Sequence, residues 1–466
     1  MLRSVLGLPL VAFCLLGDVL ARSATGDRVL VVLEPHSDKG DYSKFWASLT
    51  DRGFDLTFKK PNDDSVELVK FGEPQYDHLI MFAPSAKSFS PSLSPKTIIE
   101  AQYTHLNTLY LLSPFLSDRT RETMREYDLE FIEPNSVLLD AFSHPPSQPE
   151  SIVVLPPNTC LVPTPILAET TLSGGPIVYP SGTVHTAGLN PFLIDVLHAT
   201  KTAYVGEEQN LDADESAVED TLGGKTSKGP LFSGKRAMLV SALQTRDNVR
   251  IGFVGSGQMF SDKYWGTSVE SITGQLVETG NAAFAEDFTK WIFQERGVVK
   301  VISTAHHRQS ENQPREQYTK KDDLVYSVTL AEYYTTDNQT AAWGPVHLED
   351  LQLEFTMLDP HIRTALIEDT SVTPEMGTTY TAKFKAPDRH GVFKFMVEYF
   401  RPGLSCIVTT SMASVVPLRH DEHPRFIVGA WPFYTAPISI SFAFLLFCGL
   451  WVMLGEDDKK GKKKAE

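Results

Sequence analysis

Cysteine is scarce in this sequence, with four residues in 466, and this limits how the fold can be stabilised. Cys14 lies in an apolar leader and Cys448 in an uncharged C-terminal run, which leaves Cys160 and Cys406 for the bulk of the chain. Two cysteines exclude a disulfide scaffold, and their spacing leaves open whether they form one disulfide. With 42% hydrophobic residues, the chain can instead build ordinary apolar cores.

Clustered positive charge is also missing from most of the chain. The formal net charge is −16, and the one dense group of lysines lies in the last twelve residues, GEDDKKGKKKAE. A nucleic-acid-binding face needs clustered Lys and Arg to neutralise phosphates. We therefore expect no nucleic acid among the partners.

Motifs for catalysis and cofactor binding are absent as well. There is no Gly-x-Ser-x-Gly sequence, and neither Cys160 nor Cys406 has the histidine context of a nucleophile. Gly255-Ser256-Gly257 follows an apolar strand, but Phe260 replaces the third glycine of a dinucleotide fingerprint, which favours a tight turn. We expect no catalytic, cofactor-binding or metal-binding residue in this chain.

Charge is missing altogether from residues 426–455. Within them, Pro437–Leu454 gives 18 uncharged residues, and a helix of that length spans about 27 Å, close to the hydrocarbon thickness of a bilayer. Trp431, Phe433 and Tyr434 precede this run, as in an interfacial aromatic belt. The sequence predicts a transmembrane helix over 431–454.

The two ends of the chain predict its topology. Residues 1–21 combine Arg3, a short apolar stretch and a Val-Leu-Ala end, which is typical of a cleaved signal peptide. Residues 455–466 carry five lysines against four acidic residues, and lysines collect on the cytosolic side of a span. We therefore expect a single-pass type I protein with a cytosolic tail. Lys463 and Lys464, four and three places from the end, match a di-lysine endoplasmic-reticulum retrieval signal, although a plain stop-transfer cluster reads the same.

Strands and helices alternate over residues 28–297, which predicts an α/β domain with a mainly parallel sheet. The expected strands include RVLVVL at 28–33, DLTFK at 55–59, HLIMF at 78–82 and the pair MLVSALQ and VRIGFVGS; GNAAFAEDFTKWIFQER at 280–296 is an expected helix. An acidic stretch at 207–220 reads as an exposed loop.

Residues 298–425 change to a period of two, as in LQLEFTML at 351–358 and VFKFMVEYF at 392–400. This pattern predicts a β-sandwich. His306, His307 and Arg308 stand near its start; adjacent histidines on a strand point to opposite faces, which favours a structural role at the domain junction over a site. Asn338-Gln339-Thr340 is a formal glycosylation acceptor in a polar loop.

Several long blocks, in one order, carry a resemblance to a known family. These blocks are DRGFDLTFK, YDHLIMFAPS, LNPFLIDVL, LQTRDNVRIGFVGSGQMFSD, WIFQERGVVKV, HHR, DLQLEFTMLDPHIRT, HGVFKFMVEYFR and VVPLRHDEHPRFI. They resemble the non-catalytic, single-span DDOST/WBP-type subunit family of the endoplasmic-reticulum oligosaccharyltransferase. The resemblance runs from about Arg28 to the span and is weakest over residues 87–175.

The resemblance implies a function that composition does not show. The family's complex transfers a preassembled oligosaccharide from dolichyl diphosphate to Asn in Asn-x-Ser/Thr sequons. It implies an amidotransferase-like α/β domain that has lost its nucleophile, with the catalytic and other subunits as partners. The metal and the catalytic carboxylates belong to a many-spanning subunit whose Trp-Trp-Asp motif is absent here. It also favours retrieval through Lys463 and Lys464, and hence residence in the endoplasmic-reticulum membrane.

Two other classes remain as alternatives. A stand-alone lumenal hydrolase or amidotransferase would need an activated nucleophile, which the sequence does not offer. A single-span adhesion or interaction protein would share the β-sandwich and the span. A cell-surface protein would lack a working di-lysine tail.

Overall fold

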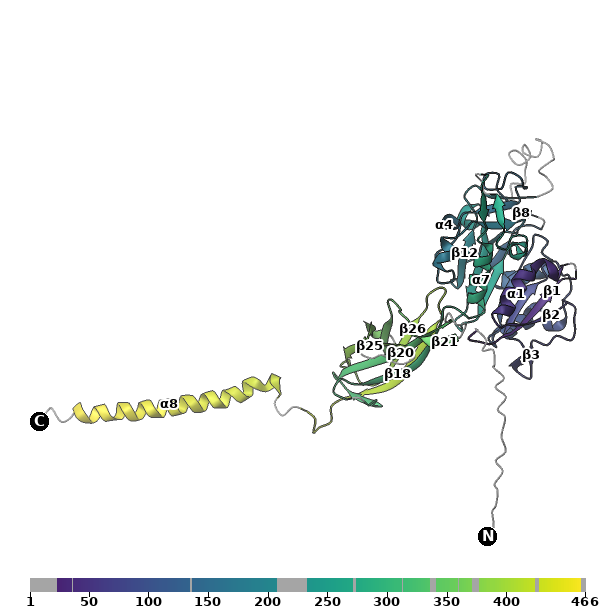
Figure 1. The fold of residues 1–466 in the computed structure, drawn as a ribbon. Coiled ribbons are helices and arrows are strands. Elements are labelled where there is room, and N and C mark those ends of the chain that lie inside the picture. The colour runs from purple at the N-terminus through teal and green to yellow at the C-terminus, as the bar shows by residue number, and fades with distance from the viewer. Residues whose placement is uncertain are drawn as a thin grey trace, which may run out of the picture.

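The computed structural model describes most of the chain, namely residues 23–35, 37–134, 136–207, 233–270, 274–311, 313–335, 341–358, 360–370, 377–423 and 427–461. The expected signal peptide at 1–21, nearly all of the acidic loop, Asn338, and Lys463 with Lys464 lie outside the described residues. The first domain, the β-rich second domain and the C-terminal helix follow one another along the chain (Figure 1).

The first domain is built on a nine-stranded mixed sheet. In spatial order its main path runs through β2 (Asp55–Lys59), β1 (Arg28–Leu33), β5 (His78–Phe82), β6 (Asn107–Leu111), β15 (Arg250–Val254), β14 (Met238–Gln244), β11 (His185–Ala187) and β7 (Leu129–Phe131). A ninth strand, β12 (Leu193–His198), pairs with β14. Pairings from β2 to β15 are parallel, and those from β15 onward are antiparallel.

The predicted α/β class is confirmed, and the sheet proves to be mixed rather than parallel throughout. The change of direction occurs at the short connection between β14 and β15, where the Thr245 N–H donates to the Val249 carbonyl at 3.0 Å. A connection of this length can join only antiparallel strands, because parallel strands need a long crossover.

Both faces of the sheet are covered, which explains the continuous apolar runs of its central strands. Along β1, Val29 and Val31 belong to one core cluster, and Leu30 and Val32 belong to the other. The first cluster packs against α1 (Ser43–Asp51) and α7 (Asn281–Ile292), and the second against α2 (Pro95–Gln102) and α3 (Asp118–Glu126). The domain is therefore a helix–sheet–helix arrangement.

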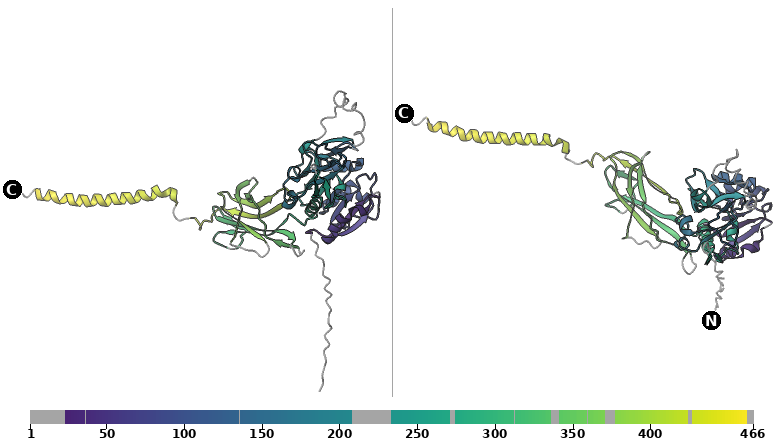
Figure 2. Two further views of the ribbon diagram at one scale, coloured as in Figure 1. Left: turned by 45° about the horizontal axis from the view of Figure 1, so that its top comes forward. Right: turned by 90° about the horizontal axis from the view of Figure 1, so that it is seen from above.

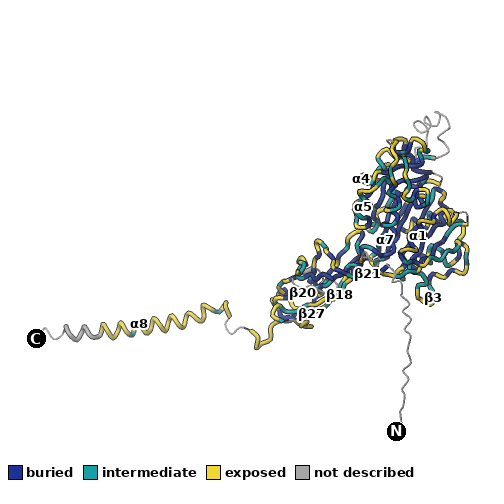
Figure 3. The backbone as a smooth tube through the Cα atoms, in the orientation of Figure 1, coloured by how far each residue is buried: buried dark blue, intermediate teal, exposed yellow. Residues whose placement is uncertain are grey.

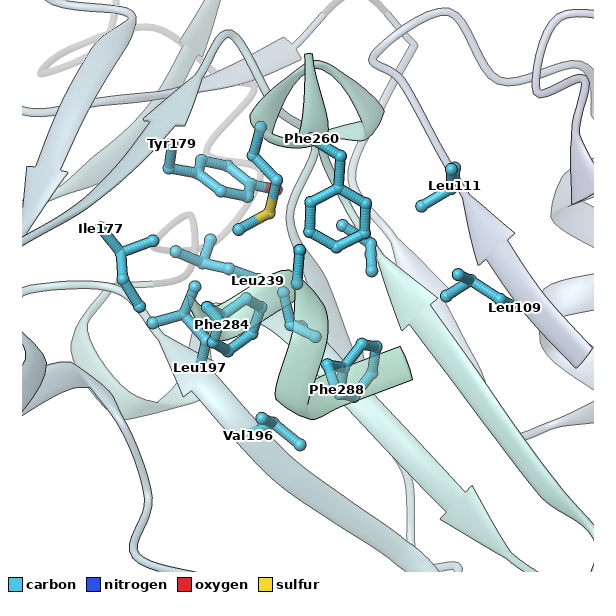
Figure 4. Close-up of a cluster of buried hydrophobic side chains, with 14 of the residues drawn as sticks. Leu109, Leu111, Ile177, Tyr179, Val196, Leu197, Leu239, Phe260, Phe284 and Phe288 are labelled. Atoms are coloured by element: carbon cyan, nitrogen blue, oxygen red, sulfur yellow. The ribbon is translucent and has the colours of Figure 1, made fainter. Parts of the chain in front are cut away.

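The α7 helix brings large aromatic side chains onto the sheet. Phe284 and Phe288 are fully buried and lie 5.8 Å apart between ring centroids, among aliphatic side chains of the strands (Figure 4). Gly252 on β15 allows this packing, because a Cβ there would lie 2.3 Å from Ile292 Cδ1 and 2.9 Å from the Phe288 ring. The fit between α7 and β15 therefore depends on the absence of a side chain at residue 252.

Shorter elements complete the first domain. Its two-stranded sheets pair β3 (Val69–Lys70) with β4 (Glu73–Pro74), β8 (Ser136–Leu139) with β13 (Tyr204–Glu207), β9 (Ile152–Leu155) with β10 (Ile177–Pro180), and β16 (Ser268–Glu270) with β17 (Leu276–Glu278). Short helices are α4 (Pro157–Cys160), α5 (Glu169–Leu172), η1 (Lys39–Tyr42), η2 (Pro91–Leu93), η4 (Gly234–Arg236) and η5 (Gly257–Phe260).

The second domain consists of two five-stranded sheets. One contains β18 (Val298–Arg308), β20 (Asp323–Thr335), β25 (Thr378–Lys385) and β24 (Ile367–Glu368), with β21 (Ala341–Gly344) on β20. The other contains β19 (Gln317–Thr319), β27 (Ile407–Val416), β26 (Gly391–Tyr399), β22 (Gln352–Thr356) and β23 (Pro360–Ala365).

The inner faces of these two sheets form one core, as a β-sandwich requires. Leu353 and Phe355, two residues apart on β22, are both fully buried. Across the core, Tyr326 of β20 stacks on Phe395 of β26 at 5.4 Å between ring centroids. The period of two in the sequence therefore marks the inward face, and the predicted β-sandwich is confirmed.

The chain continues into one long helix, α8 (Trp431–Gly461), preceded by the short η6 (Val428–Ala430). Its segment Val428–Leu454 is long and apolar enough to cross a membrane, and none of it is buried against the rest of the chain. Figure 3 shows this contrast between the exposed helix and the buried interiors of both domains. Exposed apolar side chains over such a length fit a single membrane span.

Candidate functional site

The carboxyl ends of the parallel strands are where α/β folds normally bind ligands. Glu34 follows β1 and Ser85 follows β5. The Glu34 carboxylate accepts hydrogen bonds from the Ser85 N–H at 2.6 Å and from the Ser85 hydroxyl at 2.9 Å. These two groups satisfy each other and connect two strand ends, so neither acts as a free acid or nucleophile.

A cavity of about 870 Å³ lies beside this edge. It is lined by Ser85, Lys87, Phe115, Leu116, Ser117, Asp118, Arg119, Glu122 and Pro134. Its described lining residues include neither histidine nor cysteine. The Ser117 hydroxyl is the N-cap of α3, where it accepts from the Thr120 N–H at 3.2 Å, and the Ser85 hydroxyl donates to Glu34. Neither described serine therefore has a histidine beside it, and the cavity lacks the serine–histidine pair of a hydrolase.

A serine and a histidine do meet elsewhere, between β14 and β11. The Ser241 hydroxyl and His185 Nε2 lie 2.8 Å apart, a distance suited to a nucleophile and its base. Both side chains are 0% exposed, and burial lowers the pKa of His185 to about 3. Because no substrate atom can reach a fully enclosed pair, this hydrogen bond is structural.

A second buried histidine anchors the first described residues. His78 Nε2 lies 3.3 Å from the Ser23 hydroxyl and 3.1 Å from the Gly26 carbonyl, and its Nδ1 lies 3.3 Å from the Asn107 amide nitrogen. Burial lowers the pKa of His78 to about 4, so the ring is neutral near pH 7. The Ala24 N–H also donates to the Gln294 carbonyl at 3.0 Å. These contacts attach the N-terminal segment to the sheet and have no catalytic geometry.

The remaining motifs also have structural partners. The Gly257 N–H donates to the Leu112 carbonyl at 2.8 Å, and the Ser256 hydroxyl donates to the Pro180 carbonyl at 2.5 Å, so this turn holds strands together. Cys160 and Cys406 are both buried free thiols, which answers the open question of a disulfide between them. Within the described residues, no group of three or more His, Cys, Asp and Glu is placed to hold a metal.

The cluster of His306, His307 and Arg308 requires a correction. These residues end β18, whereas the chain enters the β-sandwich at Val298, the other end of the strand. His306 Nδ1 lies 2.7 Å from the Tyr318 hydroxyl, and Arg308 pairs with Asp322 at 2.6 Å. These partners belong to the β-sandwich itself. The cluster therefore lies within the β-sandwich and not at the domain junction.

The junction is instead organised around Arg250, which is 0% exposed. Its Nη1 donates to the carbonyls of Trp291 at 2.7 Å and Arg296 at 2.6 Å, and its Nη2 donates to the Gly297 carbonyl at 2.7 Å. Burial lowers the pKa of the guanidinium to about 9, which leaves it charged near pH 7. One side chain therefore fixes the end of α7 and the chain segment that enters the β-sandwich.

The loop Arg401–Cys406 of the second domain packs against this same region. The Trp291 indole N–H donates to the Gly403 carbonyl at 2.9 Å, and the Gln244 amide donates to the Leu404 carbonyl while its oxygen accepts from the Gly403 N–H at 3.1 Å. The Asn248 amide donates to the Cys406 carbonyl at 3.2 Å and accepts from the Cys406 N–H at 2.5 Å. Side chains of the first domain thus hydrogen-bond backbone of the second, as strand partners would.

A glycine makes this close approach feasible. Gly297 has φ +66°, and a Cβ on it would lie 2.5 Å from the Gly403 carbonyl oxygen. The junction was not among the features predicted from the sequence, although one signal for it is present: Arg250 is a charged residue inside an apolar strand, VRIGFV. Buried arginines are rare unless they are paired or hydrogen-bonded, so an arginine in such a strand indicates a buried hydrogen-bonded contact.

These features define a class of protein: a single-span protein whose α/β domain, without a catalytic centre in the described residues, is hydrogen-bonded to a β-sandwich. Comparison with known families assigns it further. Residues 20–295 match the OST48 N-terminal domain, and residues 306–455 match the OST48 middle domain. The chain belongs to the OST48 family.

Curated relatives match nearly the whole chain. It is 31% identical to the dolichyl-diphosphooligosaccharide–protein glycosyltransferase 48 kDa subunit of Danio rerio, with 96% of each chain covered. It is 32% identical to the wbp1 subunit of the corresponding glycosyltransferase of Schizosaccharomyces pombe, with 95% of each chain covered. The 48 kDa subunit of Caenorhabditis elegans is 29% identical, with 96% of each chain covered.

Two solved structures are distantly similar to the chain. A ThuA-like protein from Parabacteroides merdae has a TM-score of 0.31 and 12% identity, covering 58% of this chain and 91% of its own. The carbohydrate deacetylase Agd3 has a TM-score of 0.26 and 8% identity, covering 49% of this chain and 29% of its own. Scores this low carry no functional argument.

Proposed function

We propose that this chain is a non-catalytic subunit of an oligosaccharyltransferase, the complex that transfers a preassembled oligosaccharide from dolichyl diphosphate to Asn in Asn-x-Ser/Thr sequons. The observation that carries the proposal is the match to OST48-family subunits over both domains and the span. The enclosed Ser241–His185 pair and the lining of the large cavity support an accessory role over a hydrolytic one.

The role that the structure supports best is that of a rigid support. Arg250 and the loop Arg401–Cys406 hold the two domains together, and α8 attaches them to the membrane. In this proposal, the two folded domains contact the catalytic and other subunits and position them relative to the glycan donor or the acceptor. The subunit itself binds no cofactor, and the metal of the complex resides in the catalytic subunit.

The first experiment is to purify a tagged copy of the chain from membranes in mild detergent. We expect it to carry with it a many-spanning subunit with a Trp-Trp-Asp motif, and we expect the eluate to transfer glycan to a sequon peptide. A chain that leaves intact membranes alone and without activity would contradict the proposal. The adhesion and hydrolase alternatives would then come first.

The proposed location is the endoplasmic-reticulum membrane, with the two domains in the lumen and residues 455–466 in the cytosol. Lys463 and Lys464 serve as the retrieval signal in this proposal. Replacing both by Ser is expected to let part of the protein reach the Golgi or the cell surface, as seen by microscopy. Unchanged location of the double variant would show that assembly alone retains the protein.

Lumenal exposure also makes Asn338 available for N-glycosylation. We expect peptide:N-glycosidase treatment to increase the gel mobility of the wild-type chain and to leave an Asn338→Gln variant unchanged. Equal mobility of treated and untreated wild-type chain would contradict a modified Asn338.

A further inference from the structure

A second cavity lies at the C-terminal ends of α2 and α3, whereas the first cavity lies at the start of α3. It is away from the carboxyl ends of the parallel strands. Its volume is about 320 Å³, within the range of ligand-binding pockets. Two helix ends and one hairpin form it. Its lining consists of Ile99, Gln102, Tyr103, Glu126, Tyr127, Leu243, Thr245, Asp247, Val249 and Ile251.

The electrostatics of this cavity favour a cation. The helix α2 ends at Gln102 and α3 ends at Glu126, so the negative ends of two helix dipoles meet at the lining. Glu126 and Asp247 add two carboxylates, and no Lys or Arg is among the lining residues in the described part of the chain. The nearby Arg246 turns to the second domain, where it pairs with Glu398 at 3.0 Å.

The walls and floor suit a cation with an apolar body. Tyr103 is 76% exposed and presents an aromatic ring at the rim. Leu243, Val249 and Ile251 are buried and give the floor an aliphatic surface.

A hydrogen-bonded network fixes the inner wall. The Tyr127 hydroxyl lies 3.0 Å from the Gln102 amide nitrogen and 3.2 Å from the Tyr110 hydroxyl. This network holds Tyr127 in place without any charged partner. An aromatic, acidic pocket with fixed walls is pre-organised for a cationic side chain.

We propose that this cavity receives an arginine side chain from a neighbouring polypeptide. The planar guanidinium can stack on the Tyr103 ring while Asp247 and Glu126 neutralise its charge, and the aliphatic stem can lie on the apolar floor. Charge complementarity favours a cationic side chain, and stacking on the Tyr103 ring favours arginine over lysine. Tyrosine and arginine are both enriched among the residues that contribute most to binding at protein interfaces. This binding site goes beyond the proposed subunit role and does not depend on it.

The test uses the full chain, purified with whatever subunits accompany it. The probe is a fluorescein-labelled peptide, Gly-Leu-Arg-Leu-Gly, titrated to millimolar concentration by fluorescence polarisation. Its partner probe carries citrulline, the neutral isostere of arginine. We expect the arginine peptide to bind, and we expect Tyr103→Ala or Asp247→Asn to weaken binding about tenfold.

Matched controls come from the larger cavity, which offers an exposed aromatic residue and a carboxylate in Phe115 and Asp118. Phe115→Ala and Asp118→Asn are expected to leave binding unchanged. Because Tyr103 and Asp247 are both exposed, their variants should retain the melting temperature of the wild type.

Three outcomes would overturn the proposal. They are absence of binding, equal binding of the citrulline peptide, and unchanged binding in both cavity variants. If ethylguanidinium alone displaces the peptide at equal concentration, the pocket takes a free small cation, and the polypeptide partner is wrong.

Discussion

Arg250 is a buried cation whose charge is balanced by hydrogen bonds to backbone carbonyls. The carbonyls of Trp291, Arg296 and Gly297 point at its two terminal nitrogens, at 2.6–2.7 Å. These carbonyls lie in the last turn of α7 or within five residues after its C-terminal end, where a helix leaves carbonyls without an intrahelical donor. The arginine and the helix end therefore satisfy each other, and the residue determines how α7 leads into the second domain.

Replacing Arg250 by Met should lower the free energy of unfolding by about 3–5 kcal/mol, because three buried carbonyls lose a charged donor. The Trp291 and Gly297 carbonyls then keep one backbone donor each, from Gln294 at 3.1 Å and Ser405 at 3.0 Å. Arg246→Met is the control. It breaks the exposed 3.0 Å pair with Glu398, and such pairs contribute less than about 1 kcal/mol. Denaturant unfolding of both variants in detergent measures the difference. Equal losses would mean that Arg250 does not organise the junction.

Two neutral buried histidines make stability depend on pH. Burial lowers the pKa of His78 to about 4 and that of His185 to about 3, from an ordinary value of 6.5. Between pH 6.5 and about 4, the unfolded chain binds protons that the folded chain does not, so stability falls as the pH falls through this window. Asp195 opposes this in part, because burial raises its pKa to about 6 and the folded chain binds that proton first.

We therefore expect the wild type to be less stable at pH 5 than at pH 7. His185→Gln keeps a polar partner for Ser241 but removes the titrating ring, so the difference between pH 5 and pH 7 should shrink. Urea unfolding at the two pH values measures it. His420, an exposed residue, provides the control, and His420→Gln should leave the difference as in the wild type. A His185→Gln variant with the full wild-type pH dependence would rule out this origin.

At the scale of elements, the fit of α7 onto β15 leads to another prediction. Gly252→Ala should lower the free energy of unfolding by about 1–3 kcal/mol, because the new Cβ would lie 2.3 Å from Ile292 Cδ1. Gly429→Ala is the matched control. A Cβ there meets nothing within 4 Å, and a change within about 0.5 kcal/mol is expected. Thermal unfolding of the two variants measures their losses of stability. Equal losses would indicate that β15 can move away from α7 without cost.

Local patterns predicted the elements well. DLTFK coincides with β2, and the period of two at Leu353 and Phe355 identified the inward face of β22. The pattern predicted a mainly parallel sheet but did not show which strands are antiparallel, namely the pairings of β14, β11 and β7 beyond β15. Periodicity reports which face of a strand is buried, but it does not report which strand lies beside it.

The junction could not be predicted for a related reason. The hydrogen bonds to the loop at 401–406 join residues more than 100 positions apart, such as Trp291 with Gly403, and those of Arg250 join residues 41 to 47 positions apart. Most of these bonds connect a side chain to backbone. Backbone atoms carry no sequence signal, so only the side-chain partner is visible in the sequence. His306 and Arg308 are residue types that often form functional sites, yet their partners in the structure lie within one domain.

At the scale of the whole molecule, two folded domains precede one exposed helix, and the views in Figure 2 show the two domains in contact. Phe442→Arg places a charge near the middle of Val428–Leu454, where insertion costs about 2.5–3.5 kcal/mol. We expect this variant to be extracted from membranes by alkaline carbonate to a much greater extent. Phe433→Arg, close to the aromatic N-terminal end of the segment, should remain in the pellet. Equal extraction of both variants would contradict a span over these residues.

The segment of chain that connects the β-sandwich to the membrane helix is short. β27 ends at Val416 and α8 begins at Trp431, so fifteen peptide units separate them, which is at most about 50 Å of extended chain. Because the two domains are hydrogen-bonded to each other, this single connection limits the movement of both. Any partner that the two domains contact must therefore lie near the bilayer. Its distance from the membrane cannot exceed the length of this connection plus the length of the two domains, whatever their orientation.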